Sequence, residues 1–586
     1  MNGAATGDVF DVVIVGLGPT GLTLAHALGR RGRNVLVLER EPEFYGNARA
    51  VHTDDECMRI FQSLDLADEL ESRMLTDTCV QWVLHDGRVL MHMLETARPH
   101  GWARSNFFYQ PYLESTLAER LDRYPNVTVL RGREVVRFEQ DDDGVTVHHV
   151  ASQGTRYSRT GPTDAEQVAT VAEEGVRARF MVACDGGRSQ ARTQLGIRMT
   201  GRSFPNPWLV VDIVEKQRGT GLHHLPYFDF ICDPDCPTVS CVQPEGHHRF
   251  EFMLMPGQTR EYMESPDTVR QYLARHVDVE KFEVLRHLVY TFNALIAERW
   301  RVGRVFLAGD AAHMTPQFIG QGMNAGVRDA WNLSWKLDAA LDGRGGEALL
   351  DSYQAERFPH VRDMIKTAVR MKDFVSTANP VLALLRNVVT RTAMRMPILG
   401  PYLRAGRFIP MPYYNDGCYF GQPRANRRAA PGRLAPQPTV RDPDGQRHLL
   451  DELLGNDFAV VGLGMDPRGG LALDDIEACR KLGMQFVALY PIGGRPQGNV
   501  GRANPEGVVE VEDVQGTLVD WFRSRGHAPG SVAVLRPDRF VYGVVAASES
   551  SRLVQTLICD LQRAGAVDDR TGGAPARHGI PPRQAA

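Results

Sequence analysis

Glycine and acidic side chains occur together at three places where a short apolar run ends, and groups of this kind can bind phosphates and sugars. The first is Gly16-x-Gly18-x-x-Gly21, directly after the apolar run 11–16. Glycines at this spacing permit a tight turn, the close approach of a pyrophosphate, and close packing of a helix on a strand. On its own the motif does not distinguish a ligand site from a Gly-rich turn.

The elements around this motif give it a context. Residues 11–16 predict a buried parallel strand, residues 19–31 a helix, and residues 34–39 a second strand. In this arrangement the helix presents free N–H groups to the phosphates. Glu39 ends the second strand, where its carboxylate can accept hydrogen bonds from ribose hydroxyls. The unit therefore predicts dinucleotide binding, with NAD and FAD both open at this point.

Two later segments favour FAD. The chain reads A-C-D-G-G-R-S around Asp185 and G-R-V-F-L-A-G-D around Asp310, each just after an apolar run typical of a buried strand. Backbone amides there can meet phosphates, and the Asp310 carboxylate is suited to a ribityl or ribose hydroxyl. Each segment alone could be an Asp-Gly turn. Three such sites in this order are hard to explain as turns.

The composition limits the other classes of function. With 586 residues the chain predicts two or three domains, and a net charge of -4 gives no reason to expect nucleic acid or a membrane as partner. The N-terminus has no basic region followed by an apolar run, so no signal peptide is expected. The nine cysteines are scattered, which favours a cytoplasmic protein without a disulfide framework. We expect no metal site.

The spacing of apolar runs and Pro/Gly-rich stretches predicts how the chain is divided. We expect a discontinuous dinucleotide-binding domain, a β-sheet domain, a helical segment, a linker, a C-terminal domain and a disordered tail. Their residues are 1–200 with 300–345, then 201–299, 346–409, 410–447, 448–565 and 566–586.

The three motifs, in this order, resemble those of the class A flavoprotein monooxygenases, the para-hydroxybenzoate hydroxylase-like group, over roughly residues 12–336. The resemblance implies an α/β fold, α+β overall, in which a Rossmann-like FAD-binding domain is interleaved with an antiparallel substrate sheet. It also implies FAD as cofactor, with NADH or NADPH and O2 as co-substrates. The expected reaction hydroxylates a phenolic ring to a catechol-type diol through a flavin C4a-hydroperoxide.

The same resemblance implies roles for individual residues. Asp310 would contact the ribityl chain, and the D-G segment would serve both FAD and the nicotinamide. Arg40 directly follows Glu39 at a strand end that should face FAD. The cofactor-binding residues expected in this way are Gly16, Gly18, Gly21, Glu39, Arg40, Arg49, Gln110, Asp185, Gly186, Arg192, Gly309, Asp310, Pro316, Gly320, Gly322, Met323 and Asn324.

A finer resemblance is to the bacterial 3-(3-hydroxyphenyl)propionate (3-hydroxycinnamate) hydroxylases. It is carried by N-P-W-L-V-V-D at Asn206, H-R-F-E-F-M-L-M-P-G at His248, V-Y-T-F-N-A at Val289 and L-R-P-D-R-F at Leu535. The last string lies in a unit resembling the thioredoxin-like C-terminal domain of phenol hydroxylase relatives. That unit has no C-x-x-C, so we expect a structural role, and a homodimer stays open.

Other functions stay open beside this one. Hydroxylases of resorcinol, of other simple phenols or of aromatic polyketides share the architecture. A GDI-like protein, which reuses the FAD fold as a binding module without catalysis, is the alternative outside the enzymes.

The sequence does not identify the group that deprotonates the phenol. Four residues in regions expected to approach the substrate could assist as a general base: His52, His224, Tyr227 and Tyr290. A carboxylate on the substrate would require an arginine or backbone amides, and His248 and Arg249 are the candidates.

Overall fold

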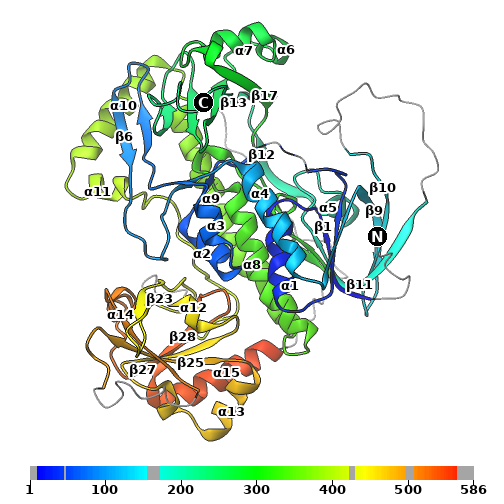
Figure 1. Cartoon of the computed structure of the whole chain (residues 1–586), viewed down its shortest axis with the longest axis vertical. Helices are drawn as coiled ribbons and strands as arrows, with labels where there is room; N and C mark the ends of the chain where they lie inside the picture. Colours follow the sequence, from blue (N-terminus) through cyan, green and yellow to red (C-terminus); the bar gives the residue numbers. More distant parts are fainter. Residues whose placement is uncertain are drawn as a thin grey trace, which may run out of the picture.

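The computed structural model describes residues 9–44, 46, 48–154, 172–421, 429–496 and 507–563. The expected disordered tail, 566–586, lies outside these residues. Figure 1 shows three parts: a sheet with long helices beside it, a second sheet above, and a C-terminal unit below in yellow to red. The mixed α/β architecture predicted from the sequence is confirmed.

The first sheet is mostly parallel and has the order β19-β20-β11-β1-β2-β8, with β9 and β10 branching from β11. Its strands β1 and β2 are apolar almost without interruption, as expected for strands covered on both faces. Helix α1 packs on α8 beside this sheet. The strands are β1 (Phe10–Val15), β2 (Val35–Glu39), β8 (Val127–Arg131), β9 (Arg133–Gln140), β10 (Val145–Ala151), β11 (Glu174–Ala183), β19 (Arg301–Val302) and β20 (Val305–Leu307).

The second sheet has the order β17-β13-β16-β15-β14-β5-β6. Strand β14 pairs in parallel with β5. Residues 80–93, which the sequence placed in the dinucleotide-binding domain, therefore join the sheet expected for the substrate. The strands are β5 (Val80–Val83), β6 (Val89–Met93), β13 (Trp208–Glu215), β14 (Phe228–Ile231), β15 (Thr238–Val242), β16 (His247–Met253) and β17 (Phe282–Tyr290).

The register separates the two faces of this second sheet. Asp212 lies opposite Arg249 and Arg286, and these three share one face with Trp208 and Glu251. Residues of the other face, such as Leu209 and Phe250, pack under α6 (Arg260–Met263) and α7 (Pro266–Leu273) in a separate core. The polar face is thus the one available to the first part of the molecule.

Two three-stranded sheets lie outside the large ones: β3 (His52–Thr53), β7 (Asn106–Phe107) and β4 (Leu75–Thr76), and β12 (Met199–Ser203), β18 (Asn293–Ala297) and β21 (His313–Met314). The described helices of these parts are α1 (Pro19–Arg30), α2 (Asp55–Ser63), α3 (Ala67–Glu71), α4 (Gln110–Glu119), α5 (Gln190–Gln194), α8 (Gly322–Leu341), α9 (Glu347–Val375), α10 (Pro380–Arg395) and α11 (Leu399–Arg404). Throughout the described segments, every helix is too short or too polar to span a bilayer.

The C-terminal sheet has the order β23-β22-β26-β25-β24-β27-β28. It begins at Thr439, inside the stretch 410–447 that the sequence predicted to be a linker, because β22 pairs with β26. Its elements are β22 (Thr439–Arg441), β23 (Arg447–Leu449), α12 (Asp451–Leu454), β24 (Ala459–Leu463), α13 (Leu473–Lys481), β25 (Gln485–Pro491), β26 (Val509–Asp513), α14 (Thr517–Arg523), β27 (Ser531–Leu535), β28 (Val541–Ala546) and α15 (Ser550–Gln562).

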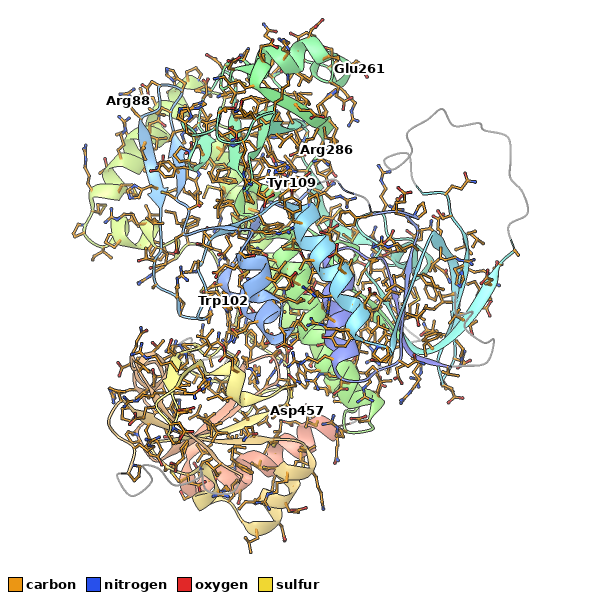
Figure 2. The ribbon with its side chains drawn as sticks, in the orientation of Figure 1. Arg88, Trp102, Tyr109, Glu261, Arg286 and Asp457 are labelled. Atoms are coloured by element: carbon orange, nitrogen blue, oxygen red, sulfur yellow. The ribbon has the colours of Figure 1, made fainter. Side chains whose placement is uncertain are left out.

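Buried charges dock the C-terminal unit on α8 and α9. Arg536, which is fully buried, donates to both carboxylate oxygens of Glu356 on α9 at 2.7 and 2.8 Å. Lys336 on α8 donates to the same carboxylate at 2.7 Å. At the edge of this contact, where Figure 2 labels Asp457, Arg31 of the first part pairs with that aspartate at 3.1 Å.

Candidate active site

The glycines of the first motif have different neighbours. A Cβ atom on Gly21 would lie 2.0 Å from the carbonyl oxygen of Gly16, and Gly16 itself has φ +102°. A Cβ atom on Gly18 would meet nothing within 4 Å. Two of the glycines are therefore required by packing and backbone conformation. Gly18 borders open space at the N-terminus of α1. A pyrophosphate can bind in such a space, because the free N–H groups of the helix face it.

This difference predicts that two alanine variants will differ in stability. Gly18→Ala is expected to leave the unfolding free energy of FAD-stripped protein within about 0.5 kcal/mol of wild type. It should weaken FAD binding about tenfold or more, because the methyl group enters the cradle. Gly21→Ala should also destabilise the stripped protein, by about 1–3 kcal/mol. Flavin titration and urea unfolding measure both, and equal unfolding free energies for the two variants would contradict the assignment.

The second and third motifs lie at the same edge of the first sheet. Asp185 follows β11 and Asp310 follows β20, and these two strands are parallel neighbours. The Oδ1 atom of Asp185 is buried without a hydrogen-bond partner among the described residues. Its Oδ2 atom accepts from the Ala191 amide at 3.2 Å. An unpartnered acceptor at this depth fits a hydroxyl-bearing ligand.

Asp310 is accessible to solvent even though protein surrounds it. The residue is exposed, while desolvation raises the pKa of its carboxyl group. An exposed carboxyl group can accept a hydrogen bond from a ligand. FAD therefore fits the residues present, since a ribityl hydroxyl could donate to this carboxylate.

Asp329 on α8 supports the third motif from behind. Its carboxylate accepts from the Gly309 amide at 3.1 Å, from Arg357 at 2.8 Å, and pairs with His313 at 2.6 Å. Sequence reasoning missed Asp329. The available signal was its position on α8, about two turns after the glycines Gly320 and Gly322.

Arg192 connects the second and third motifs. Its guanidinium donates to the Gly187 carbonyl at 2.8 Å and to the Ala311 carbonyl at 2.9 Å. The sequence predicts a contact with FAD or the nicotinamide. In the structure both terminal nitrogens of Arg192 donate to backbone carbonyl groups. Arg192 therefore orders the loops that would meet the cofactor.

The segment that carries Arg49 is held from two sides. The Gln110 side chain accepts from the Arg49 and Ala50 amides. Arg249 and Arg286, both bonded to Asp212, donate to the Ala48 carbonyl. Figure 2 shows Arg286 near Tyr109, where the second sheet meets α4. The exposed Arg49 side chain is thereby presented from an ordered backbone.

These contacts correct the prediction for a substrate carboxylate. The Arg249 guanidinium is buried and engaged by Asp212 at 2.6 Å and by the Ala48 and Arg49 carbonyls. His248 lies on the opposite face of the sheet, where it bonds Ser240 at 2.8 Å. Neither side chain is available to a ligand on the polar face, because the pairing register assigns them to other partners.

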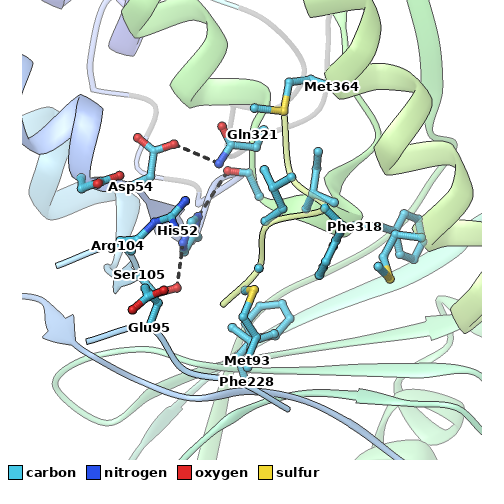
Figure 3. A pocket seen from close by; sticks show the side chains of 18 of the residues that line it. His52, Asp54, Met93, Glu95, Arg104, Ser105, Phe228, Phe318, Gln321 and Met364 are labelled. Carbon is cyan, nitrogen blue, oxygen red and sulfur yellow. Dashed lines mark hydrogen bonds between the residues drawn. The ribbon is translucent and has the colours of Figure 1, made fainter. Parts of the chain in front are cut away.

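A cavity of about 1140 Å³, counted to its open mouth, lies beside the loop that leads into α8. Gln321 lies at one end (Figure 3), and the preceding residue, Gly320, also lines the cavity. Its apolar walls come from the second sheet, from β7, from the turn before α8 and from the segment after α11, and they include Trp82, Phe107, Phe228, Phe230, Phe318 and Phe408. Polar side chains gather on the other side: His52, Arg104, Ser105 and Glu95. The walls suit an aromatic ring.

Of the four candidate bases, His52 alone lines this cavity. Its Nε2 atom lies 3.1 Å from the Ser105 hydroxyl, and its Nδ1 atom lies 3.5 Å from the Gly320 carbonyl. Desolvation lowers its pKa. His224 bonds the His276 carbonyl on an exposed turn. Tyr227 and Tyr290 are 42% and 48% exposed, so the cavity geometry favours His52.

Some of the remaining predicted cofactor residues bond backbone groups nearby, and others are exposed to solvent. Asn324 is buried at the start of α8 and donates to the Gly320 carbonyl at 2.9 Å, while its Oδ1 atom has no described partner. Arg40 is largely exposed and lies 3.6 Å from Glu41. Glu39 accepts from the Leu17 amide at 2.7 Å and so fixes the first loop. Pro316 precedes the turn at 317–319, and Gly322 and Met323 are the first two residues of α8.

A buried ion network behind His52 was missed from the sequence. Arg328 pairs with Asp54 and with Glu56, and it donates to Gln321 at 2.9 Å. The Gln321 side chain in turn donates to Asp54 at 3.0 Å. The signal available was Asp54 as the N-cap of α2 and the seven-residue spacing of Gln321 and Arg328.

Two family models match this chain. A family model described as FAD binding domain matches residues 9–368, and one described as HcaD C-terminal domain matches residues 432–560. A 3-(3-hydroxy-phenyl)propionate/3-hydroxycinnamic acid hydroxylase of Escherichia coli O81 (strain ED1a) is 37% identical over 531 residues, 90% of this chain and 91% of the relative. The enzyme of that description from Escherichia coli (strain K12) is 36% identical over the same shares.

Solved structures share the fold at lower identity. Aklavinone-11 hydroxylase, solved with FAD and aklavinone, aligns with a TM-score of 0.73 at 23% identity, over 96% of this chain and 100% of its own. The flavin-dependent monooxygenase PieE, solved with FAD and substrate, aligns with a TM-score of 0.76 at 21% identity, over 95% and 100%.

Proposed function

Because this chain belongs to the FAD binding domain family, we propose that it hydroxylates 3-(3-hydroxyphenyl)propionate or 3-hydroxycinnamate, using FAD, a reduced nicotinamide and O2. The prediction of an FAD-dependent aromatic hydroxylase is confirmed by this membership and by the 37% identity to the curated hydroxylases. The finer choice of substrate is the proposal. A binding module without catalysis is not favoured.

One observation carries the choice of a small phenolic acid. The cavity has aromatic walls on one side, and His52, Ser105 and Arg104 form a group of polar residues on the other. A single ring with a short polar chain matches this division between apolar and polar walls.

We propose that the three motifs and the start of α8 hold the FAD. The residues are Gly16, Gly18, Gly21, Glu39, Arg49, Asp185, Asp310 and the first turn of α8, with Gln110 and Arg192 ordering the loops. Bound FAD supplies the chemistry that places one atom of O2 on the ring. The N–H groups in the first turn of α8 lack intrahelical acceptors and can stabilise negative charge.

We also propose that the three parts divide the work. The first part binds FAD, the second sheet covers the substrate, and the C-terminal unit has a structural role. The aromatic walls exclude water from the reacting ring, which limits unproductive loss of the oxidising equivalent.

His52 is proposed to take the phenolic proton. A proton on Nδ1, directed at the Gly320 carbonyl, leaves Nε2 as the acceptor that faces the Ser105 hydroxyl. Because burial lowers the pKa of His52, the ring stays neutral and able to accept a proton at pH 7. Ser105 can donate to Nε2 while it accepts from the phenol.

His52→Gln is therefore expected to lower kcat on the order of 10²-fold at pH 7. The deficit should shrink as the pH approaches about 10, where a phenol ionises without help. In wild type the acid limb of kcat/KM should lie below the ordinary imidazole value of about 6.5, since the shift is downward. A deficit that stays constant from pH 6 to 10 would contradict the role.

The proposed substrate is tested with a panel of phenols assayed for stimulated NADH and NADPH oxidation and for diol formation. We expect the holoenzyme to be stimulated most by 3-(3-hydroxyphenyl)propionate and 3-hydroxycinnamate. Stimulation by resorcinol or an aromatic polyketide, with none by the two acids, would replace this substrate with one of the alternatives.

A further inference from the structure

Two arginines line the cavity, and their surroundings differ. Arg328 is fully engaged, with ion pairs to Asp54 and Glu56. Arg104 has no carboxylate within ion-pair distance among the described residues. Its one described hydrogen bond runs from Nη2 to the Met411 sulfur at 3.5 Å. Since a thioether is a weak acceptor and a guanidinium carries five donors, most of its hydrogen-bonding capacity is unused.

The other charges of the cavity wall are mostly paired. Asp55 is paired with His100 at 2.9 Å, and Asp77 with Arg98 at 2.5 Å. Glu95 is the lining carboxylate that has no ion pair in the described part of the chain. It lies on the same polar side as Arg104 (Figure 3). Arg104 is therefore the cavity cation that is free to meet an anion brought by a ligand.

The neighbours of Arg104 locate this cation relative to the proposed chemistry. Ser105 is the next residue along the chain, and it bonds His52 at 3.1 Å. The guanidinium and the proposed proton acceptor thus belong to one wall, opposite the aromatic side chains. A phenol with its acidic chain meta to the hydroxyl can turn both groups toward one wall while its ring contacts the other.

We propose that Arg104 binds the carboxylate of the substrate and so selects phenols that carry an acidic side chain. This inference rests on the proposed function and assigns its carboxylate subsite. The planar guanidinium can hold both oxygens of a carboxylate in parallel hydrogen bonds, which a lysine ammonium cannot reproduce. Glu95 opposes anions on the same wall, so substrate affinity reflects the balance of the two charges.

Arg104→Gln tests the subsite by comparing an acid with a neutral analogue of similar shape. For 3-(3-hydroxyphenyl)propionate, kcat/KM should fall about 10- to 100-fold, mainly through KM. For 3-ethylphenol it should change less than about twofold. Arg104→Lys should recover part of the loss. Glu95→Gln should lower KM for the acid, an effect of opposite sign, and the exposed Arg88→Gln should change neither substrate.

Equal losses for the acid and for 3-ethylphenol, with normal FAD content, would overturn the subsite, as would no loss for either. Calorimetric binding of 3-phenylpropionate, which lacks the hydroxyl group, separates this inference from the proposed function. Tenfold weaker binding of this acid to Arg104→Gln supports the subsite even if wild type hydroxylates no phenol. Unchanged binding refutes the subsite even if wild type is an active hydroxylase.

Discussion

Replacement of Asp310 by alanine is expected to weaken FAD binding by about 10- to 100-fold, while the FAD-free protein becomes no less stable. A hydrogen bond to a charged acceptor contributes about 1.5–3 kcal/mol, and the proposed ribityl contact would be lost. The carboxyl group itself is costly to the empty protein, because desolvation raises its pKa. The Asp310 carboxyl group therefore destabilises the empty protein but can bind a cofactor.

The pH dependence follows from the direction of this shift. A carboxyl group whose pKa is higher in the folded chain than in the unfolded chain binds more protons when folded. Its contribution to stability therefore falls as the pH rises through that range. FAD-free Asp310→Ala should therefore lose less stability than FAD-free wild type as the pH rises above the ordinary carboxyl value of about 3.8.

Flavin absorbance after gel filtration and thermal unfolding of stripped protein measure these effects. Asp310→Asn is the matched control, since it removes the charge and keeps an acceptor, and it should fall between wild type and alanine. Wild-type flavin content in Asp310→Ala would refute the assigned contact.

Replacement of Arg536 by methionine is expected to destabilise the protein by about 3–5 kcal/mol, the cost of breaking a buried ion pair on one side. The fully buried guanidinium bonds Glu356 on α9 and lies 2.6 Å from Asp538. Its loss leaves Asp538 without this partner, and Glu356 keeps Lys336. The nearby positive charges hold the pKa of Glu356 at about 2.

A depressed carboxyl pKa gives a stabilising contribution above the unfolded value of about 4.5 that is lost as the pH falls through about 2. Arg536→Met should remove much of this acid-sensitive part. Urea unfolding of the full chain, followed by tryptophan fluorescence and by protease cleavage between the parts, provides the measurement. Arg552→Met on α15, at a side chain that is 73% exposed, is the control. A cost below about 0.5 kcal/mol for Arg536→Met would contradict the docking role.

Local patterns were sufficient for the elements of the first part. The strand predicted over 11–16 is β1, and the helix predicted over 19–31 is α1, each within a residue or two. These elements are specified by contiguous residues, because a buried parallel strand is apolar throughout and a glycine loop must follow it. The sequence was less informative for the β5–β6 hairpin, because it joins the second sheet through the pairing of β5 with β14, which lies more than a hundred residues away in the sequence.

The candidate site divides in the same way. Gly16, Gly21 and Glu39 could be singled out because their roles are local, within one strand-loop-helix unit. The neighbouring residues in the sequence do not indicate a role for Arg104. Its role becomes visible only when the cavity is known and no carboxylate is found to pair with it among the described residues. Arg249 was a candidate for the substrate carboxylate because the sequence does not show its actual partner, Asp212, which is 37 positions away.

The sequence by itself thus determined the family, the cofactor and the order of the three motifs, all of which follow from short stretches whose residues act together. Only the tertiary structure decided that His52 among the four candidates reaches the cavity, that Arg192 holds backbone, and that Arg104 faces the ligand space. These assignments depend on which distant groups share a wall or compete for the same charge. That competition is settled by packing between sheets and by the pairing of buried charges, which no single segment encodes.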